Sequence, residues 1–576
     1  MSAAQYEVIS LSISDLDRIK LPQFQRKLVW NKQKKDQFIE TLHEGLPFGA
    51  ILVYPMNNEP DSTLLILDGQ QRLSTIREFQ EHPLLFWKPL NESAYKECLD
   101  SVNQHLSEDT QLSPKDFDEI LGYDINKYYD WLYATASQED DREAIKSLIL
   151  NLRTKLDSYI DPDSLKIPAI RYFGSKDRIA AVFSNLNRGG IPLSKYEIYS
   201  AAWIHTEIPL LPHGESDLQD EILQNVKDYY AEMENSTEFE LEGFSEDELT
   251  KNRVINLSEY GTALGMFIQK HLSSLVPKTA SSASEIGFGV LGIAAGIDNK
   301  RLGELNSSLD DINRNLQSDL EHIARICTNL HGVFSKILKV FKAKKNDEYA
   351  QGISTTFKTL SYFAALWNLD PSSIEYQNSL INIKSSYVYD ALTKAWSSHG
   401  DQRLYEYYPK IKRRDYLTPV PRDKFIDAFR QWLSDDTPNI RFSGEIKALV
   451  TIHANLTYLA AAVPYAMDFE LEHIISKKLI NASDNPGRRA LHGGSIGNCM
   501  YLPKLQNNKK KEKNLYQVND YGEFDELIVD SLYPTRDDLA AATAALSQKN
   551  FITVNDIILK RSLLIGDSLI DALLKN

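Results

Sequence analysis

The spacing of apolar residues divides the chain into a mixed N-terminal part and a mostly helical remainder. Apolar positions three and four apart predict a helix over residues 32–44, and from 206 to about 415 the same spacing predominates. Short apolar runs predict buried strands at 50–54, 64–67 and 167–172. The pattern therefore indicates an α+β fold class with a mixed N-terminal domain over 1–205, a mostly helical region over 206–415 and a C-terminal domain over 416–576.

Length and composition agree with a multidomain globular protein. A chain of 576 residues is too long for one hydrophobic core, and its 42% hydrophobic and 25% charged residues are typical of soluble domains. Three scattered cysteines cannot build a disulfide framework or a thiolate zinc site, which favours a reducing compartment. No signal peptide or membrane-spanning stretch is evident, so we expect a cytoplasmic protein without membrane contact.

Two stretches rich in glycine and serine in the helical region are expected to have structural roles. Residues 281–285 are expected to form a loop that precedes a helix. Residues 287–292 match the pattern GxGxxG, but no strand precedes them and no acidic residue follows at the distance that a dinucleotide site requires. We therefore expect close packing of helices there, and any nucleotide site to lie elsewhere.

Charge is unevenly distributed along a chain whose formal net charge is −16. That total argues against a protein that coats nucleic acid with its whole surface, but it allows a local basic groove. Residues 206–249 are strongly acidic and indicate a solvated face. Residues 473–514 hold nine Lys or Arg against two acids, and this basic stretch overlaps the candidate catalytic residues described next.

The most informative segment combines an acidic residue, a histidine and two later asparagines. Glu472 and His473 end a predicted strand, and Asn498 is expected to open a second one. Pro503 can occupy the first turn of a helix that carries Asn507 one turn in. Strand, loop, strand and helix would bring Glu472, His473 and Asn507 to one small pocket.

These residue types suit the hydrolysis of a phosphodiester. Histidine titrates near neutral pH and can deprotonate water, and oxygen ligands from Glu and Asn suit Mg²⁺ or Mn²⁺ better than Zn²⁺. A half-buried structural histidine beside a solvated lysine-rich helix is the simpler interpretation, but Glu472 and the asparagine spacing favour the functional one. Four lysines could hold DNA phosphates without reading the sequence: Lys504, Lys509, Lys510 and Lys511.

A second motif, Asp68-Gly69-Gln70-Gln71-Arg72, follows the predicted strand 64–67 and precedes a helix. Gly69 permits a sharp turn, and the start of a helix favours anions. Arg72, together with Arg26 of an earlier motif (residues 21–30), could grip phosphates, while Asp68 could bind a metal ion or a ribose hydroxyl. A third motif covers residues 182–194. Each motif alone is also compatible with an ordinary structural turn.

The C-terminal segment resembles the HNH nuclease family, and the ordered set of motifs resembles GmrSD-type modification-dependent (type IV) restriction endonucleases in fused form. The first resemblance implies a ββα-metal domain with His473 as general base, Glu472 and Asn507 as ligands of Mg²⁺ or Mn²⁺, and Asn498 as the residue that holds the loop and orients the histidine. Asn508 is a rival for the second ligand position. Ser476 stands where the family often has proline.

The second resemblance implies a ParB/sulfiredoxin-like GmrS domain that binds a nucleoside triphosphate through 68–72, and a GmrD-like nuclease domain that cuts modified phage double-stranded DNA. It thereby implies defence against phage. Two other functions remain open at this point: a modified-DNA sensor whose nuclease site is degenerate and which recruits another effector, and an NTP-regulated toxin that acts on RNA. The sequence also leaves open whether the protein forms a homodimer.

Overall fold

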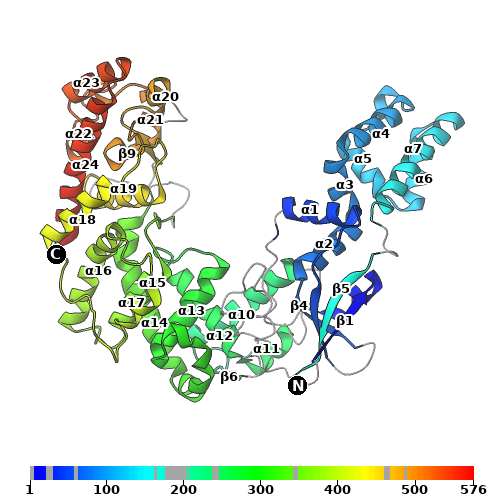
Figure 1. Ribbon diagram of the computed structural model, residues 1–576, viewed down its shortest axis with the longest axis horizontal. Coiled ribbons are helices and arrows are strands. Elements are labelled where there is room, and N and C mark those ends of the chain that lie inside the picture. Colours follow the sequence, from blue (N-terminus) through cyan, green and yellow to red (C-terminus); the bar gives the residue numbers. More distant parts are fainter. Residues whose placement is uncertain are drawn as a thin grey trace. The chain divides into compact units, whose positions relative to one another are not determined.

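The computed structural model describes residues 5–20, 30, 32–56, 62–160, 165–174, 203, 206–236, 245–340, 348–459, 468–484 and 489–575. The chain forms two compact units (Figure 1). Unit 1 comprises Met1–Ile204 and Lys227–Asn252, and unit 2 comprises His205–Val226 and Arg253–Asn576. In the described residues, no helix combines the length and the apolar character needed to cross a bilayer.

Unit 1 contains a five-stranded mixed sheet with the strand order β1-β5-β3-β4-β2. β1 and β5 are antiparallel, β5 and β3 are parallel, β3 and β4 are antiparallel, and β4 and β2 are parallel. The strands predicted near 50, 64 and 167 are confirmed, as is the helix near 32. Their bounds are β1 (Tyr6–Leu11), β2 (Ile19–Lys20), α1 (Lys32–His43), β3 (Ile51–Pro55), β4 (Leu64–Asp68), α2 (Gln70–Glu81) and β5 (Ile167–Tyr172).

Between α2 and β5 the chain forms a helical module with its own core. Two of its helices begin at side-chain caps, because the hydroxyl of Ser113 and the carboxylate of Asp124 accept hydrogen bonds from backbone N–H groups of the first turn. Large aromatic residues such as Trp87, Phe117 and Tyr128 fill the core. The helices are α3 (Pro83–Leu90), α4 (Glu92–Gln104), α5 (Pro114–Leu121), α6 (Ile125–Thr135) and α7 (Glu139–Asp157).

Unit 2 is mostly helical, as the apolar spacing predicts. A short antiparallel pair of strands, β6 (Ile208–Pro209) and β7 (Val254–Ile255), precedes the helices. The long helices are α10 (Asp217–Ser236), which both units share, α12 (Leu257–His271), α13 (Ala280–Ala295), α14 (Leu309–Leu338), α15 (Thr356–Leu366), α16 (Ile374–Leu392), α18 (Arg422–Ser434) and α19 (Gly444–Leu456). Shorter helices are α11 (Glu246–Asn252) in unit 1, and η5 (Asn299–Ser308) and α17 (Gly400–Tyr405) in unit 2.

The prediction of a loop over residues 281–285 is wrong, because these residues belong to α13. The side chain of Thr279 caps the helix by accepting a hydrogen bond from the N–H of Ser282. Small residues then let α13 approach α12 so closely that a Cβ at Gly287 would lie 1.9 Å from the carbonyl oxygen of Gly261. Close packing of the two helices therefore explains the glycine pattern, as expected.

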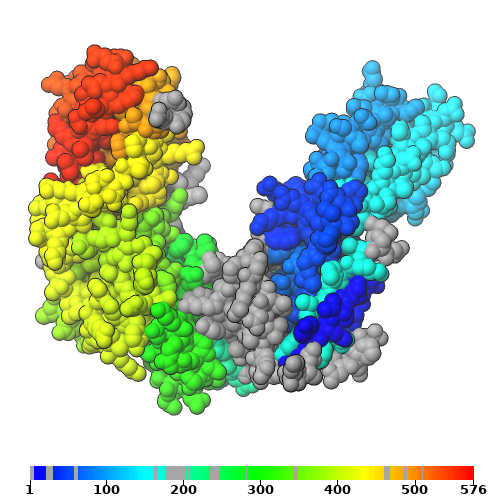
Figure 2. Space-filling view, in the orientation of Figure 1, coloured from blue at the N-terminus to red at the C-terminus, as the bar shows by residue number. Residues whose placement is uncertain are grey.

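The C-terminal part of unit 2 combines two strands with a helical support. β8 (Phe469–His473) and β9 (Cys499–Pro503) pair antiparallel, and α21 (Lys504–Lys510) follows directly. The orange and red elements of this part form a closely packed mass in Figure 2. Its other elements are α20 (Lys477–Ser483), η6 (Ile496–Asn498), η7 (Leu515–Gln517), α22 (Asp525–Asp530), α23 (Arg536–Ser547) and α24 (Phe551–Leu574).

A buried histidine of α19, the helix that packs against β9, is expected to make the stability of unit 2 depend on pH. His453 is 2% exposed, and burial lowers its pKa to about 3. Its pKa in the unfolded chain is about 6.5. On acidification, the unfolded chain thus binds the proton at a higher pH than the folded chain does. The free energy of unfolding therefore falls as the pH drops from 6.5 towards 3. Between pH 7 and pH 5 we expect a loss of about 2 kcal/mol.

The variant His453→Gln should remove this loss, because it deletes the titrating group and keeps a polar side chain. Urea unfolding of unit 2 at pH 7 and pH 5 measures the difference. His399→Gln, at an exposed histidine of unit 2, serves as the control and should leave the pH dependence unchanged. An equal pH dependence in the wild type and His453→Gln would contradict this account.

Candidate active site

The strand pair and the helix after it form a ββα arrangement at the predicted position. Glu472 pairs with Met500 and His473 with Cys499, so β8 ends at the residue expected to act as base. α21 packs on both strands and carries Asn507 one turn in (Figure 1, orange). Two local details differ from the prediction: Asn498 ends the short helix η6 before β9, and Pro503 ends β9 and precedes α21.

Two carboxylates on one face of β8 meet two residues on one face of α21. Glu470 and Glu472 are two positions apart and so share a face of the strand, and Asn507 and Lys510 are three apart and so share a face of the helix. The amide nitrogen of Asn507 donates to Glu470 at 3.2 Å, and the ammonium of Lys510 lies 2.7 Å from the Glu472 carboxylate. The structure thus gathers three expected residues, Glu472, Asn507 and Lys510, with Glu470, which the sequence pattern did not single out.

His473 lies at the end of the same strand but on the alternate face, where it contacts Ile440 and Phe442. The single pocket expected for Glu472, His473 and Asn507 is therefore not formed by these contacts. The Nε2 of His473 hydrogen-bonds with the carbonyl oxygen of Ile440 at 2.8 Å, and its ring stacks on Phe442 with centroids 4.0 Å apart. A carbonyl only accepts, so Nε2 carries the proton and Nδ1 keeps its lone pair. Burial lowers the pKa of His473, which keeps the imidazole neutral at physiological pH. A neutral, oriented imidazole can accept a proton from water.

Asn498 holds the end of the loop against the segment after His473. It is 1% exposed, its side-chain oxygen accepts from the N–H of Ile475 at 2.7 Å, and its nitrogen donates to Ile475 and Gly493 carbonyls. The backbone N–H of Ile474 also donates to the Asn498 carbonyl at 3.0 Å. These bonds fix the position of the chain just after His473.

A buried arginine from α24 holds the other side of the same loop. Arg561 is 3% exposed and donates to the backbone carbonyl oxygens of Gly497 and Cys499 at 3.0 and 2.9 Å. It also donates to the carbonyls of Ser531 and Leu532, both at 2.9 Å. No sequence signal distinguishes it, because an arginine inside an apolar helix pattern gives no indication of its partners.

The donor set of this region fits a hard divalent cation. The described residues contain no cluster of three or more His, Cys, Asp or Glu side chains that could hold a metal. Glu472 and the side-chain oxygen of Asn507 are nevertheless oxygen donors of the kind that Mg²⁺ and Mn²⁺ prefer, and Mg²⁺ commonly uses one or two carboxylates. The cationic Lys510 already lies against Glu472, so that carboxylate would be shared between the lysine and the ion.

The four candidate phosphate-binding lysines differ in exposure. Lys504 and Lys511 are exposed, although Lys504 lies 3.6 Å from the Glu470 carboxylate. Lys510 is 1% exposed and paired with Glu472, so it could reach DNA only if that ion pair opened. The side chain of Lys509 lies outside the described set. The exposed positive charge that a phosphate could contact therefore lies at the two ends of α21.

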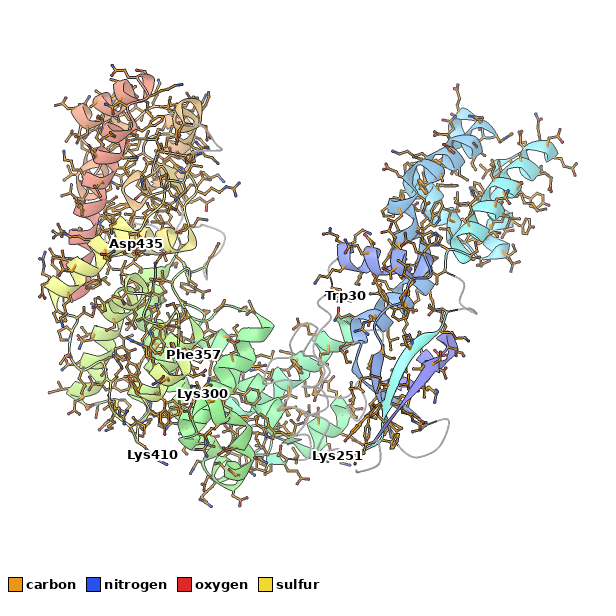
Figure 3. The ribbon with its side chains drawn as sticks, viewed as in Figure 1. Trp30, Lys251, Lys300, Phe357, Lys410 and Asp435 are labelled. Carbon is orange, nitrogen blue, oxygen red and sulfur yellow. The ribbon has the colours of Figure 1, made fainter. Side chains whose placement is uncertain are left out.

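In unit 1, the turn of the second motif has the expected geometry. Gly69 has φ = 100° and precedes α2, and a Cβ there would lie 2.4 Å from the side chain of Ile51, so only glycine fits. Gln70 is 5% exposed, and neither atom of its amide has a hydrogen-bond partner in the described structure. The side-chain oxygen of Gln71 accepts from the N–H of Trp30 at 2.8 Å, which joins the two N-terminal motifs. Figure 3 labels Trp30.

Arg72 makes structural contacts beside its candidate role. Its guanidinium donates to the carbonyl oxygens of Gly49 and Ala50 at 2.7 and 2.8 Å, and it lies 3.7 Å from the Asp68 carboxylate. Arg72 therefore holds the chain before β3 in place, and Asp68 lies next to it at the start of the turn. Arg26 and the third motif, 182–194, lie outside the described residues.

Comparison with known proteins bears on unit 1. Residues 8–204 match the family model of the GmrSD restriction endonuclease, N-terminal domain. The N-terminal part of this chain is thus similar to the N-terminal domain of GmrSD restriction endonucleases. The uncharacterised protein MJ0686 of Methanocaldococcus jannaschii is 24% identical over 231 residues, which cover 32% of this chain and 38% of that protein. The chain thus spans well under two thirds of that relative.

Proposed function

We propose that the chain is a type IV restriction enzyme, a metal-dependent HNH endonuclease that cuts modified phage DNA under the control of a nucleoside triphosphate. The GmrSD-type N-terminal domain supports a restriction endonuclease. The observation that carries the nuclease assignment is the ββα arrangement, in which Glu472 and His473 end one strand and Asn507 lies one turn into the next helix. The proposal places the protein in the cytoplasm, where phage DNA enters.

The residues of unit 2 would divide the work of hydrolysis. His473 Nδ1 accepts the proton of the attacking water, and the bond from Nε2 to Ile440 keeps the ring oriented. Asn498 and Arg561 hold the loop that follows the base. Glu472 and Asn507 would hold a divalent ion, which neutralises charge that develops on the phosphate. Lys504 and Lys511 would attract the DNA backbone without reading its sequence.

Cleavage of phage DNA tests the proposal. Modified and unmodified DNA should be incubated with the full chain and Mg²⁺ or Mn²⁺, with and without each nucleoside triphosphate. We expect cleavage of modified DNA that requires the metal, stops with EDTA and changes with nucleotide. Cleavage of RNA alone, or no cleavage of any nucleic acid, would contradict the proposal.

The nucleotide site is proposed at the turn between β4 and α2. The buried, unpartnered amide of Gln70 and the start of a twelve-residue helix support a polar ligand there. Asp68→Ala and Arg72→Ala should each weaken binding or turnover of nucleotide at least several-fold, which a labelled-nucleotide binding assay measures. Glu81→Ala, an exposed position at the other end of α2, should bind normally. Unchanged binding in both variants would exclude this site.

One observation favours a second function, a modified-DNA sensor with a degenerate nuclease site. The ammonium of Lys510 is 1% exposed and lies 2.7 Å from Glu472, the first proposed metal ligand. If that pair stayed closed, the ligand would be unavailable to a metal and the chain would bind DNA without cutting it. The cleavage assay separates the two functions, because the sensor would retain binding of modified DNA while showing no products.

A further inference from the structure

A cavity of about 130 Å³ lies where three helices of unit 2 end. α13 ends at Ala295 and α15 ends at Leu366, and α17 ends at Tyr405, which belongs to the cavity wall. The volume approaches the roughly 150 Å³ of a cavity that admits one benzene ring. The cavity therefore has room for a single six-membered ring, and a two-ring base would exceed it.

Aromatic side chains line this cavity. Trp367 and Tyr405 are half-buried and belong to its wall, and the rings of Tyr405 and Tyr408 lie 5.3 Å apart. Tyr408 is 1% exposed, and its hydroxyl lies on the side of Gly292, 3.5 Å from where a Cβ of that residue would be. The two half-buried rings of the wall thus suit a flat aromatic ligand.

One exposed basic residue lies in the cavity wall, and others lie in the chain segments that adjoin it. Lys410 is part of its wall, and its ammonium lies 3.2 Å from where a Cβ of Gly296 would be. Figure 3 labels Lys300 and Lys410 in this part of unit 2. Among the described residues, no ion pair involves Lys300, Lys410, Lys412 or Arg413.

Two neighbouring basic residues are paired with acids, Arg301 with Glu304 and Arg414 with Glu406. Two further acids, Asp298 and Asp401, accept hydrogen bonds from the uncharged N–H of Lys300 and the amide of Asn299 and so keep their charges. The four basic residues with no ion pair in the described structure outnumber these two acids. A net positive cluster beside a ring-sized aromatic cavity, in a chain of net charge −16, matches a base and its flanking phosphates.

We propose that this cavity binds one pyrimidine base turned out of a DNA duplex. Trp367 and Tyr405 would stack on the base, and Lys410 would contact a flanking phosphate. Turning a base out costs a few kcal/mol, and least where the base is mismatched. This inference rests on the proposed function, which makes DNA the partner. It adds the residues that would bind the base.

Binding to three duplexes tests the proposal. The full chain carrying His473→Ala, in EDTA, should be titrated by fluorescence anisotropy against a matched duplex, one with a single mismatched cytosine and one with an abasic site there. We expect the mismatched duplex to bind several-fold tighter than the other two. A fluorescent cytosine analogue at the mismatch should also change its emission on binding, because it leaves the stack.

Pocket variants make the test specific. Tyr405→Ala should remove the preference for the mismatch and weaken that complex about ten-fold or more, since stacking of a base on an aromatic ring is worth about 1–3 kcal/mol. Lys410→Ala, at an exposed position that cannot disturb folding, should weaken all three complexes and reduce their salt dependence. Lys424→Ala, at an exposed lysine of α18 outside the cavity wall, should bind like its parent.

Equal affinity for the three duplexes, or a mismatch preference that survives Tyr405→Ala, would overturn the proposal. Binding is measured without cleavage, so the two proposals fail separately. A chain that cuts DNA but shows no mismatch preference loses the cavity assignment alone. A chain that prefers the mismatch but never cuts loses the nuclease assignment alone.

Discussion

His473→Ala should lower the rate of DNA cleavage by about 10²–10⁴-fold while leaving folding and nucleotide binding intact. General-base catalysis contributes about that factor, and the imidazole of His473 is the neutral, oriented base at the end of β8. The side chain is only half-buried and its partners are one carbonyl and one ring, so its loss should be tolerated structurally. Single-turnover cleavage of modified DNA at saturating metal measures the effect.

His213→Ala serves as the matched control, because this histidine is highly exposed and lies in a loop. It should cut DNA at the rate of the wild type. Circular dichroism of both variants would show whether the fold is retained. Undiminished, EDTA-sensitive cleavage by His473→Ala would move the active site to another part of the chain.

Arg561→Met should destabilise unit 2 by about 3–5 kcal/mol and abolish cleavage with it. The guanidinium satisfies backbone carbonyls of η6, β9 and the turn after α22 at once, and methionine would leave these buried acceptors without donors. Domains are stable by only about 5–15 kcal/mol, so the loss is a large share of the total. Urea unfolding compared with the wild type measures it.

Two further variants sharpen this prediction. Lys560→Met removes the neighbouring lysine, whose ion pair with Asp538 is exposed, and it should change stability by less than about 1 kcal/mol. Arg561→Lys keeps the charge but lacks the planar set of five donors, so we expect an intermediate loss. Equal stability of Arg561→Met and Lys560→Met would show that the arginine does not hold the loop.

The strands and the main turns of the fold could be predicted because their causes are local. Apolar runs bounded by turn residues predicted β3, β4 and β5. The glycine at position 69, which adopts a positive φ, predicted the turn there. The order Glu472, His473, Asn507 likewise predicted two strands and a helix. Each of these depends on residues that are neighbours in sequence.

Contacts between distant segments could not be predicted in the same way. No local pattern indicates that Lys510 is buried against Glu472, that Asn507 bonds Glu470, or that Arg561 reaches the η6 loop. Residues 281–285 resembled a loop because small polar residues disfavour helices when considered alone. The close approach of α12 to α13, which needs small residues, reversed that local preference.

A titration of the DNA-free chain with Mn²⁺, followed by electron paramagnetic resonance, tests most directly whether Glu472 and Asn507 form a metal centre. We predict one bound ion per chain, whose affinity falls in Glu472→Gln and in Asn507→Ala by more than the 10–100-fold typical of losing a mere supporting group. Glu512→Gln, at a nearby exposed acid, should bind as the wild type does. Binding that is equally tight in all four proteins would contradict the account.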